Sequence, residues 1–424
     1  MKRSALSRRL FLAAGSALAG AGLMGPPRPR AEETAGPTAD SPPKTSRLAA
    51  INSIFRLRSH AYHIVGRMVH GYEKDGFHHQ PPVRMARMMN DQSPAGDLGQ
   101  GFCQRHGIKL CKSVAETLGP ALDVDGVLLI IEHGDYPVNE FGQVLYPRYD
   151  FFRQIVEVFE RVGRSVPVFV DKHLSYDHRR AAEMVATAKK LGFPLMAGSS
   201  LPVTWRIPDI EPPLGTPFAE AVCTFGFDRG PAEIYLFHAL ETLQCLVERR
   251  PSGETGVKSV RCLAGDEVWR AIDRGQISAR LVDAAIARCP SRNVGPLREN
   301  VTQPLAIVIE YADGTRGAVL NLVEQTSEFG FAATVKGQAE PIATYFHLPS
   351  PPGARFFDPL CWNIERLLTT GQSPYPVERT QLTSTVLDIA LHSLKEGGRA
   401  LSDPALAIRY RAPAESGHFR GPDR

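Results

Sequence analysis

Several patterns that often identify a function are missing from this sequence. It contains no Cys-x-x-Cys pair, no internal repeat and no low-complexity block beyond its N-terminal region. Its seven cysteines are an odd number without regular spacing. They favour neither a disulfide framework nor a thiol-based metal or nucleophile site. The chain of 424 residues with 43% hydrophobic content is instead typical of a globular protein of two or three domains.

A strong charge bias is also missing, although the net charge of +4 first suggests one. Six basic residues and no acidic residue lie within positions 1–31. Without that segment, 43 basic residues face 45 acidic residues. A balance of this kind does not indicate a nucleic-acid partner.

The first residues have the features of a targeting segment. Ser7-Arg8-Arg9-Leu10-Phe11-Leu12 is a twin-arginine pattern, and a weakly apolar stretch follows it to about Met24. This stretch is too short for a stable membrane span. We therefore predict a signal peptide over 1–31, a disordered linker over 32–46, and a periplasmic or secreted location for a protein that folds before export.

The glycines of a dinucleotide-binding turn are missing after the first predicted strand. The three positions of a G-x-G-x-x-G pattern hold Asn52, Ile54 and Leu57. Glycines there permit the tight turn and the close approach of the pyrophosphate, so side chains would push a dinucleotide outward. The start of the next helix could still bind an anion, helped by Arg56 and Arg58.

Residues 47–204 alternate between apolar strands and amphipathic helices. Strands are predicted at 47–51, 83–89, 125–131, 166–170 and 194–198, and helices at 97–106, 148–163 and 177–191. Repeated strand–helix–strand units imply a parallel sheet with right-handed crossovers. This half is predicted to be an α/β Rossmann-like domain.

The pattern changes after a proline-rich stretch at 205–218. The strands predicted beyond it are 219–226, 257–263, 305–311, 315–323, 331–336 and 342–347, with helices at 231–249, 265–274, 277–288, 354–369 and 377–396. A hairpin around Ala312-Asp313-Gly314 indicates antiparallel pairing. We predict an α+β domain over 205–410 with a mostly antiparallel open sheet, and a loose tail over 411–424.

Polar residues follow three of the predicted parallel strands. Asp171-Lys172-His173 follows 166–170, Glu132-His133 and Asp135 follow 125–131, and Asp91 follows 83–89. Open α/β sheets bind ligands at the carboxyl ends of their strands. We rank an acid/base cluster first, hydrogen-bonded loop residues second and a metal site third, and assign no metal ligand.

Two segments carry a resemblance to a known family. The stretch 166–175, followed by a helix that closes at Leu191-Gly192 and the strand 193–198, resembles the Glu-Lys-Pro region of the Gfo/Idh/MocA oxidoreductases. Lys172 falls on the family's lysine, Asp171 on its glutamate and His173 on its proline. Ile234–Glu241 is similar to the family's helix with a histidine, here His238, and a carboxylate three residues on, here Glu241.

The resemblance implies an NAD(P)-dependent oxidoreductase that acts on a sugar or polyol hydroxyl. It assigns His238 as acid/base and Lys172 as its electrostatic partner, with Asp171 and Glu241 beside them. The cofactor side is expected to involve Asn52, Ser53, Arg56, Asp91, Glu132 and His133. The open sheet of the second domain is a possible surface for a homo-oligomer.

Two alternatives stay open. Because the glycines and the proline after Lys172 are missing, the chain could be a degenerate, non-redox carbohydrate-binding or scaffolding protein of the same fold. A metal-assisted lyase or hydrolase is the third hypothesis, with ligands drawn from a set at the strand ends: Glu132, His133, Asp135, Asp171 and His173.

Overall fold

The structure is a computed structural model that describes residues 45–228, 230–349 and 353–421. The predicted signal peptide and nearly all of the predicted linker lie outside these residues. The chain divides into two units, Met1–Pro43 and Lys44–Arg424, and all of the described residues belong to the second. The predicted boundary at 204/205 stays a prediction, because residues 44–424 form one compact unit.

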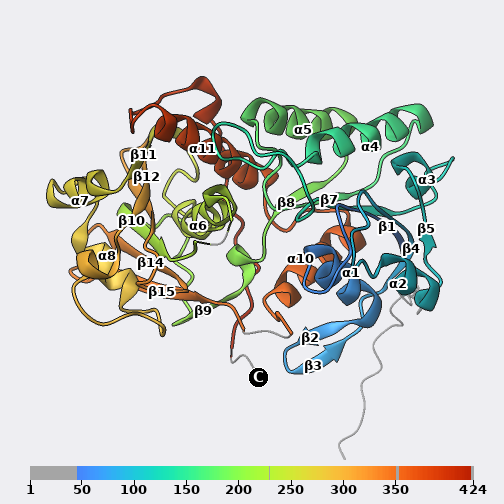
Figure 1. Cartoon of the computed structure of the whole chain (residues 1–424), viewed down its shortest axis with the longest axis horizontal. Helices are drawn as coiled ribbons and strands as arrows, with labels where there is room; N and C mark the ends of the chain where they lie inside the picture. The colour runs from blue at the N-terminus through green and yellow to red at the C-terminus, as the bar shows by residue number, and fades with distance from the viewer. Residues whose placement is uncertain (1–44, 229, 350–352, 422–424) are drawn as a thin grey trace, which may run out of the picture. The chain divides into compact units, whose positions relative to one another are not determined.

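The first half of this unit is built on a six-stranded parallel sheet (Figure 1). Its spatial order is β5-β4-β1-β6-β7-β8, which is 3-2-1-4-5-6 in order of appearance. The strands are β1 (Ser46–Asn52), β4 (Val83–Asn90), β5 (Lys109–Leu110), β6 (Gly126–Ile130), β7 (Val168–Asp171) and β8 (Leu195–Gly198). This order is that of a dinucleotide-binding Rossmann sheet, which confirms the predicted fold class of this half.

Helices cover both faces of the sheet because its strands are apolar on both sides. Val127 and Leu129 of β6 pack into one core, and Leu128 and Ile130 into the other. Figure 1 shows α4 (Arg148–Val162) and α5 (His178–Leu191) on one face, and α1 (His60–His70) and α10 (Phe357–Thr370) on the other. The late helix α10 thus completes a core that begins with β1.

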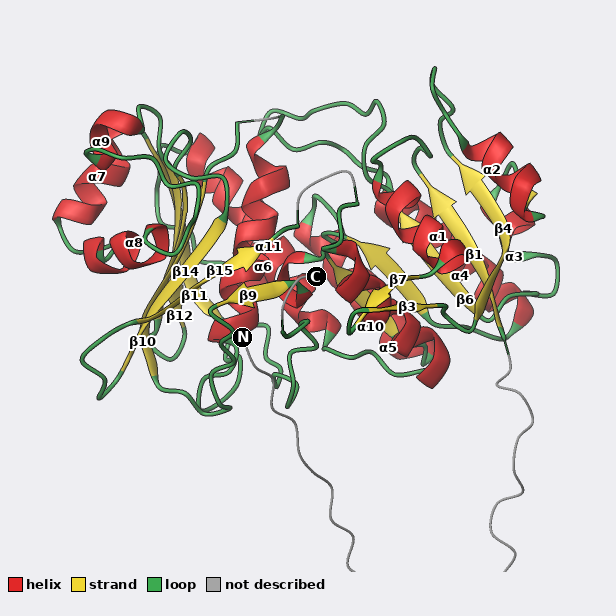
Figure 2. Cartoon of the chain, turned by 90° about the horizontal axis from the view of Figure 1, so that it is seen from below, coloured by secondary structure: helices red, strands yellow, loops and turns green. Residues whose placement is uncertain are grey.

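The second half contains a seven-stranded mixed sheet in the order β11-β12-β13-β10-β14-β15-β9 (Figure 2). Its only parallel pair among the described strands is β10 with β13, so the prediction of a mostly antiparallel sheet is confirmed. The strands are β9 (Trp205–Ile207), β10 (Phe218–Phe225), β11 (Val257–Ala264), β12 (Leu305–Tyr311), β13 (Arg316–Asn321), β14 (Phe329–Val335) and β15 (Ile342–His347).

Each face of this second sheet has its own helices. On one face, α6 (Ala232–Val247) and α11 (Val377–Lys395) form the largest apolar core of the chain's described part. On the other face lie α7 (Asp266–Asp273) and α8 (Ala279–Ile286). The remaining elements are α2 (Gly99–His106), α3 (Val114–Leu118), α9 (Leu297–Asn300), β2 (Tyr72–Lys74), β3 (Phe77–His79) and two short 3-10 turns, Leu201–Val203 and Pro404–Leu406.

Residues 411–421 are held against the fold, so the prediction of a loose tail is wrong for them. The buried Arg249 donates through its guanidinium to the carbonyls of Pro413 and Ala414, each at 3.0 Å. The Phe419 amide donates to the Val203 carbonyl at 3.0 Å. Side chains of the tail dock as well, as in the 2.7 Å contact from His418 to Asp209. Sequence composition missed this because Pro and Gly content reveals neither backbone acceptors nor distant side-chain partners.

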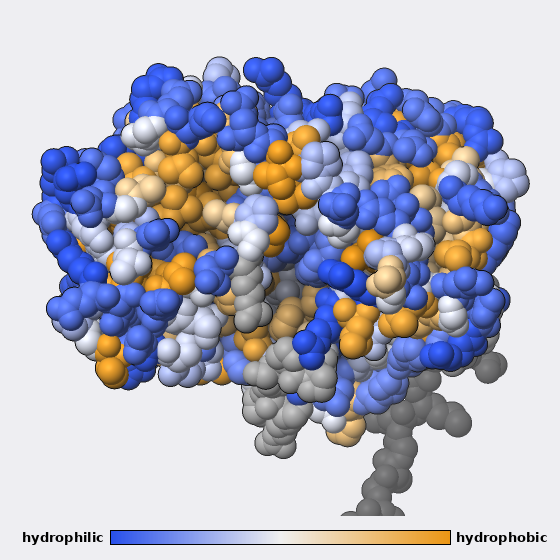
Figure 3. Space-filling model, viewed as in Figure 1, coloured by the Kyte–Doolittle hydropathy of each residue, from blue (hydrophilic) through white to orange (hydrophobic). Residues whose placement is uncertain are grey.

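The surface seen in Figure 3 is hydrophilic around its rim, and hydrophobic residues gather over the elements of the second sheet. Within the described residues, no helix is both long enough and apolar enough to cross a membrane. The predicted homo-oligomer through the second sheet stays a prediction.

Candidate functional site

The candidate site lies where the strand order of the first sheet reverses. β1 pairs with β4 on one side and with β6 on the other, and both neighbours run parallel to it. The chain therefore leaves β1 and β6 in opposite directions, which opens a crevice at their carboxyl ends. The residues that follow these two strands, and β7 beside them, are the polar residues singled out from the sequence.

A buried ion cluster follows β6 and β7. The Lys172 ammonium lies 2.8 Å from Oε1 of Glu132, and the Arg148 guanidinium lies 2.7 Å from Oε2. Burial alone would raise the pKa of Glu132, but Lys172 and Arg148 together hold it well below its usual range. Arg148 also contacts Nε2 of His173 at 2.9 Å. The structure thus brings the two predicted strand ends together around the Glu132 carboxylate, which stays ionised.

The backbone at both strand ends adopts a left-handed conformation. Lys172 has φ 65° and His133 has φ 66°, although neither is a glycine. A residue with a Cβ atom pays of order 1–3 kcal/mol for such a conformation. At Lys172 the amide donates to the Gly198 carbonyl at 3.1 Å, which fixes the turn against β8. Strain of this kind is typical of functional sites.

Asp171 is held from the first helix. Its Oδ2 lies 2.7 Å from Nδ1 of His60, the first residue of α1. The His60 ring in turn meets the His133 ring edge-on, with centroids 5.4 Å apart. Burial lowers the pKa of His133 to about 4, so this imidazole is neutral near pH 7. His60 was not predicted, because a histidine at a helix start gives no signal before its partner is known.

His238 is buried on α6 and its ring is anchored by Ser199, the residue after β8. Its Nδ1 lies 2.9 Å from Ser199 Oγ, which lies 2.5 Å from Oε2 of Glu241. Burial, followed by the charge of Lys172, lowers the pKa of His238 well below its ordinary value. His238 is therefore a neutral imidazole in the electrostatic range of Lys172. The structure brings together the predicted acid/base residue, its carboxylate and the predicted lysine.

Glu233 is a site residue that the sequence did not identify. Oε1 of this fully buried carboxylate accepts the Val144 amide at 2.7 Å, while Oε2 has no partner among the described residues. Burial raises its pKa to about 7, and the nearby Arg148 opposes that rise. The first turn of α6 places Glu233 within the electrostatic range of Arg148, Glu132 and Lys172.

Unpartnered polar atoms gather around this site. Besides Glu233, the buried atoms Asn52 Oδ1, Asp171 Oδ1 and Arg148 Nε have no hydrogen-bond partner in the part of the chain that is described. Buried polar atoms are satisfied in the great majority of cases, and exceptions indicate a bound ligand or water. Their position at the strand ends supports a polar ligand at this edge.

The turn after β1 only partly fits a dinucleotide. The Phe55 amide, which would face a pyrophosphate, donates to Oδ2 of Asp97 at 3.2 Å. Ser59 Oγ caps α1 by accepting the Tyr62 amide at 3.2 Å. Arg56 is exposed beside this turn. The amides of Phe55 and Tyr62 are therefore engaged by the chain itself.

The other predicted cofactor residues differ in whether they face solvent at a strand end or bond to neighbouring strands. Asp91, at the end of β4, is exposed and accepts the Tyr136 hydroxyl at 2.7 Å, which is where a ribose-binding acid belongs. Asn52 donates to Oδ1 of Asn90 at 3.1 Å. Ser53 donates its hydroxyl to the Glu132 carbonyl at 2.5 Å and so connects β1 to β6. A nicotinamide dinucleotide thus fits at its ribose and reactive ends and not by the usual glycine-turn contacts.

The set of ligands proposed for a metal does not assemble. Both oxygens of Glu132 are in ion pairs, and Asp135 meets Gln92 through its backbone. Among the described residues, the one group with suitable spacing is Asp177, His178 and Asp388, which shares no residue with the proposed set. Its members are already bonded, as in the 2.7 Å contact from His178 to Asp388.

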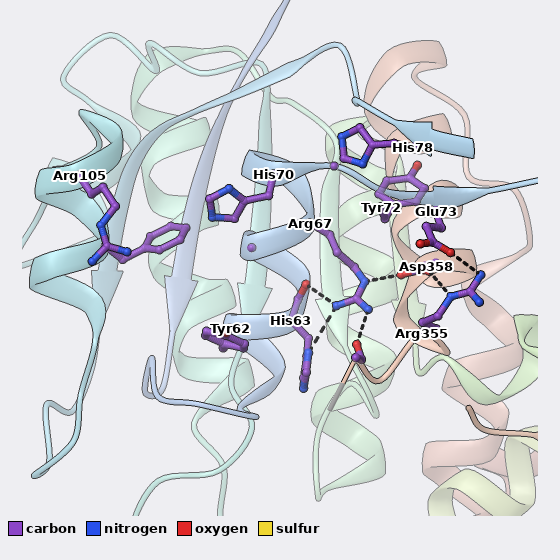
Figure 4. A pocket seen from close by; sticks show the side chains of 14 residues that line it. Tyr62, His63, Arg67, His70, Tyr72, Glu73, His78, Arg105, Arg355 and Asp358 are labelled. Atoms are coloured by element: carbon purple, nitrogen blue, oxygen red, sulfur yellow. Dashed lines mark hydrogen bonds and ion pairs between the residues drawn. The ribbon is translucent and has the colours of Figure 1, made fainter. Parts of the chain in front are cut away.

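A hollow of about 550 Å³ lies along the outer side of α1 (Figure 4). None of the predicted site residues lines it. Arg67 on its wall is bound to Asp358 at 2.6 Å, and Arg355 lies 3.1 Å from Glu73. Because these charges are paired within the chain, we place the function at the strand ends and not in this hollow.

No family model matches the chain, and no curated protein matches it. Solved structures share its fold at low identity. GenD2 from gentamicin A biosynthesis, in complex with NAD, is 12% identical with a TM-score of 0.54, over 87% of this chain and 99% of that one.

Two further structures carry inositol dehydrogenase names. The myo-inositol 2-dehydrogenase from Lactobacillus plantarum is 10% identical with a TM-score of 0.52, over 85% of this chain and 99% of that one. A putative myo-inositol dehydrogenase from Sinorhizobium meliloti 1021 is 15% identical with a TM-score of 0.50, over 84% and 99%. These likenesses confirm the predicted Gfo/Idh/MocA resemblance at the level of the fold.

Proposed function

We propose that this chain is an oxidoreductase that transfers a hydride between NAD or NADP and a sugar or polyol carbon bearing a hydroxyl. The observation that carries the proposal is a neutral, buried His238 whose Nδ1 is anchored by Ser199, within the electrostatic range of Lys172. The shared fold supports it, since one solved structure is a complex with NAD and two carry dehydrogenase names.

His238 is the proton acceptor in this proposal. Oxidation of an alcohol removes a hydroxyl proton as well as a hydride, and a positioned base contributes about 10²–10⁴-fold to such a step. The neutral ring can accept a proton at Nε2, because Nδ1 is engaged by Ser199 Oγ. Among the described residues, no hydrogen bond occupies Nε2.

Lys172 stabilises the oxygen that loses the proton. Its ammonium is fixed by Glu132 at 2.8 Å, and that carboxylate stays ionised beside Arg148. A positive charge held in place in a buried site lowers the energy of a developing oxyanion. The same arrangement lets Lys172 polarise a carbonyl in the reverse direction.

The cofactor, when bound, supplies the hydride chemistry. Asp91 would hold a ribose hydroxyl, and the exposed guanidinium of Arg56 would meet the phosphate charge in place of the amides taken by Asp97 and Ser59. Such binding depends on side-chain charge and is therefore expected to weaken with salt.

The test is direct. Full-length protein is purified from the cytoplasm and denatured, and the supernatant is assayed for nicotinamide cofactor. In parallel, native protein is heated with NAD⁺ or NADP⁺, and Asp91→Asn serves as the variant with a weakened ribose site. Bound cofactor, or a thermal shift that Asp91→Asn reduces, supports the proposal. Absence of both overturns it.

A non-redox sugar-binding protein of the same fold is the second candidate. The observation that favours it is the Asp97 carboxylate on the Phe55 amide, at 3.2 Å, where a pyrophosphate would lie. It predicts no cofactor in the assay above, together with a thermal shift on addition of polyols such as myo-inositol. A cofactor shift would exclude it.

We also propose export by the twin-arginine route, from the Arg8-Arg9 pair in the N-terminal segment. A protein exported in folded form could carry its cofactor with it, and this suits a tightly held nicotinamide. Replacement of both arginines by lysine should keep the protein in the cytoplasm on cell fractionation. Unchanged location would contradict this route.

A further inference from the structure

Three side chains form a continuous hydrogen-bonded chain that ends in the buried interior. His238 Nδ1 contacts Ser199 Oγ at 2.9 Å, and Ser199 Oγ contacts Glu241 Oε2 at 2.5 Å. His238 and Glu241 lie one turn apart on α6, while Ser199 comes from the end of β8. Glu241 is 1% exposed and Ser199 is 1% exposed, so water does not compete for these bonds.

The carboxylate is fixed by more than the hydroxyl. The Ser199 amide donates to Oε1 of Glu241 at 3.1 Å and to Oε2 at 3.2 Å. Gly198 has φ 125°, and a Cβ atom there would come within 2.6 Å of the same oxygen. A glycine is therefore required for the close approach of β8 to Glu241. Both oxygens of Glu241 accept from the Ser199 amide, and Oε2 also accepts from the Ser199 hydroxyl.

A serine hydroxyl has one proton, so the direction of this chain is linked to the protonation of Glu241. When Glu241 is ionised, Ser199 donates to it and accepts from His238 Nδ1–H, which leaves Nε2 as a base. When Glu241 is protonated, it donates to Ser199, Ser199 donates to Nδ1, and Nε2 carries the proton. The two states prepare His238 for opposite directions of reaction.

We propose that Ser199 and Glu241 are positioning residues that relay the substrate proton between His238 and the interior. This inference rests on the proposed function. The alcohol O–H bond breaks and its proton binds Nε2 of His238. The proton on Nδ1 moves to Ser199 Oγ, and the serine proton moves to Oε2 of Glu241. His238 ends neutral and Glu241 ends protonated, while a bound oxidised nicotinamide would supply the acceptor for the hydride.

The surroundings keep both states of Glu241 accessible near neutral pH. Burial raises its pKa to about 7, against the hydrogen bonds from Ser199 and the positive charges of Arg379 and Lys172. The other titratable groups that act on the pair are Tyr375, Cys245, His60, Glu132 and His173. A carboxylate with this pKa can take up a proton and release it near pH 7.

The test observes the tautomer of His238 and needs neither cofactor nor substrate. The full-length protein is labelled with ¹⁵N-histidine, and the His238 signals are assigned with His238→Asn. In the wild type, we expect the proton to move from Nδ1 at pH 9 to Nε2 at pH 5, with a midpoint near 7. One unchanged tautomer over this range would overturn the relay.

Two variants and one control sharpen the result. In Glu241→Gln, the amide oxygen takes the Ser199 N–H and the amide nitrogen donates to Ser199 Oγ, so His238 should carry its proton on Nε2 at every pH. In Ser199→Ala, the midpoint near 7 should disappear. Ser200 is also buried, and in the control variant Ser200→Ala the tautomer of His238 should change with pH as it does in the wild type. A wild-type titration in either Ser199→Ala or Glu241→Gln would contradict the relay.

The kinetic consequence separates this inference from the proposed function. If the chain binds no nicotinamide but the tautomer follows Glu241, the proposed function fails and the hydrogen-bonded switch stands. If activity is present, Ser199→Ala should lower kcat by up to about 100-fold and remove the inflection near pH 7, with little change in KM. Activity with an unchanged pH profile would overturn the relay alone.

Discussion

Lys172 combines an uncommon backbone conformation with an ammonium held by the single carboxylate of Glu132, and this suggests a role other than stability. We expect Lys172→Met to lower kcat by about 10²–10³-fold, because the methionine keeps the methylene chain and loses the charge. The fold should persist, since Arg148 still neutralises Glu132 at 2.7 Å. Steady-state kinetics and a circular dichroism melt measure both effects.

The matched control for this substitution is Lys190→Met, at an exposed position of α5. It removes the same charge from the same half of the chain and should leave kcat unchanged. Wild-type kcat in Lys172→Met would remove Lys172 from the site. A large loss of kcat in Lys190→Met would show that net charge, and not position, is responsible.

Glu233 permits a prediction about pH. Burial raises its pKa from 4.5 to about 7, so the folded state holds its proton more tightly than the unfolded state. The protonated Glu233 therefore stabilises the folded state; this contribution is fully present below pH 4.5 and is lost as the pH rises through 7. The glutamine in Glu233→Gln cannot ionise. When the pH rises from 5 to 8, the free energy of unfolding of this variant should therefore increase by on the order of 2–3 kcal/mol relative to that of the wild type.

Urea denaturation at both pH values measures this difference. Taking the difference between pH 5 and pH 8 cancels any constant cost of burying the amide group. Glu160→Gln, at an exposed position of α4, should show no such change. A Glu233→Gln protein with equal relative stability at the two pH values would contradict the raised pKa.

The sequence predicted some of these residues and not others, for a physical reason. Lys172 and Glu132 follow buried strands, and strand ends can be located from apolar runs. Arg148 lies at the start of an amphipathic helix, where a charged residue is usually solvated. Ser199 and Glu233 act through partners 42 and 89 positions away, Glu241 and Val144 respectively. No local pattern contains such pairs.

At the scale of elements, a strong hydrophobic periodicity was sufficient to locate helices and strands in the sequence. The predicted helix 148–163 and strand 125–131 match α4 and β6 within a residue or two. The hairpin β2–β3 was missed within a His/Gly/Pro-rich insert, because strands of three residues carry too little periodicity. The order of strands in each sheet follows from long-range pairing, which the family resemblance indicated and local pattern did not.

The C-terminal segment is the element whose role the structure changed most. Arg249 is buried and uses the carbonyls of Pro413 and Ala414 as acceptors. Removal of residues 412–424 would leave this guanidinium without them, so we expect a loss of about 2–4 kcal/mol in the free energy of unfolding. Removal of 422–424 alone is the control and should have no effect. Equal stability of both truncated chains would contradict this role.

At the scale of the whole described unit, one helix belongs to both halves. From α11, Thr380 donates to the Ala197 carbonyl at 2.8 Å, and Ser384 Oγ accepts the Leu174 amide at 3.2 Å. The same helix packs in the core of the second sheet through Leu387 and Leu391. Since these contacts are buried, loss of either half would expose the helix on which the other half depends.

We therefore expect residues 44–424 to unfold in one cooperative transition. The three tryptophans allow a test, because Trp269 lies on α7 beside the second sheet and Trp362 lies on α10 beneath the first. Two variants, each retaining one of these tryptophans with phenylalanine at the other two positions, are unfolded in urea. Both fluorescence midpoints should coincide with that from circular dichroism. If the Trp362 signal changes at a lower urea concentration than the Trp269 signal, α11 does not couple the halves, and the relay between Ser199 and Glu241 would have to work across an interface that opens independently of the fold.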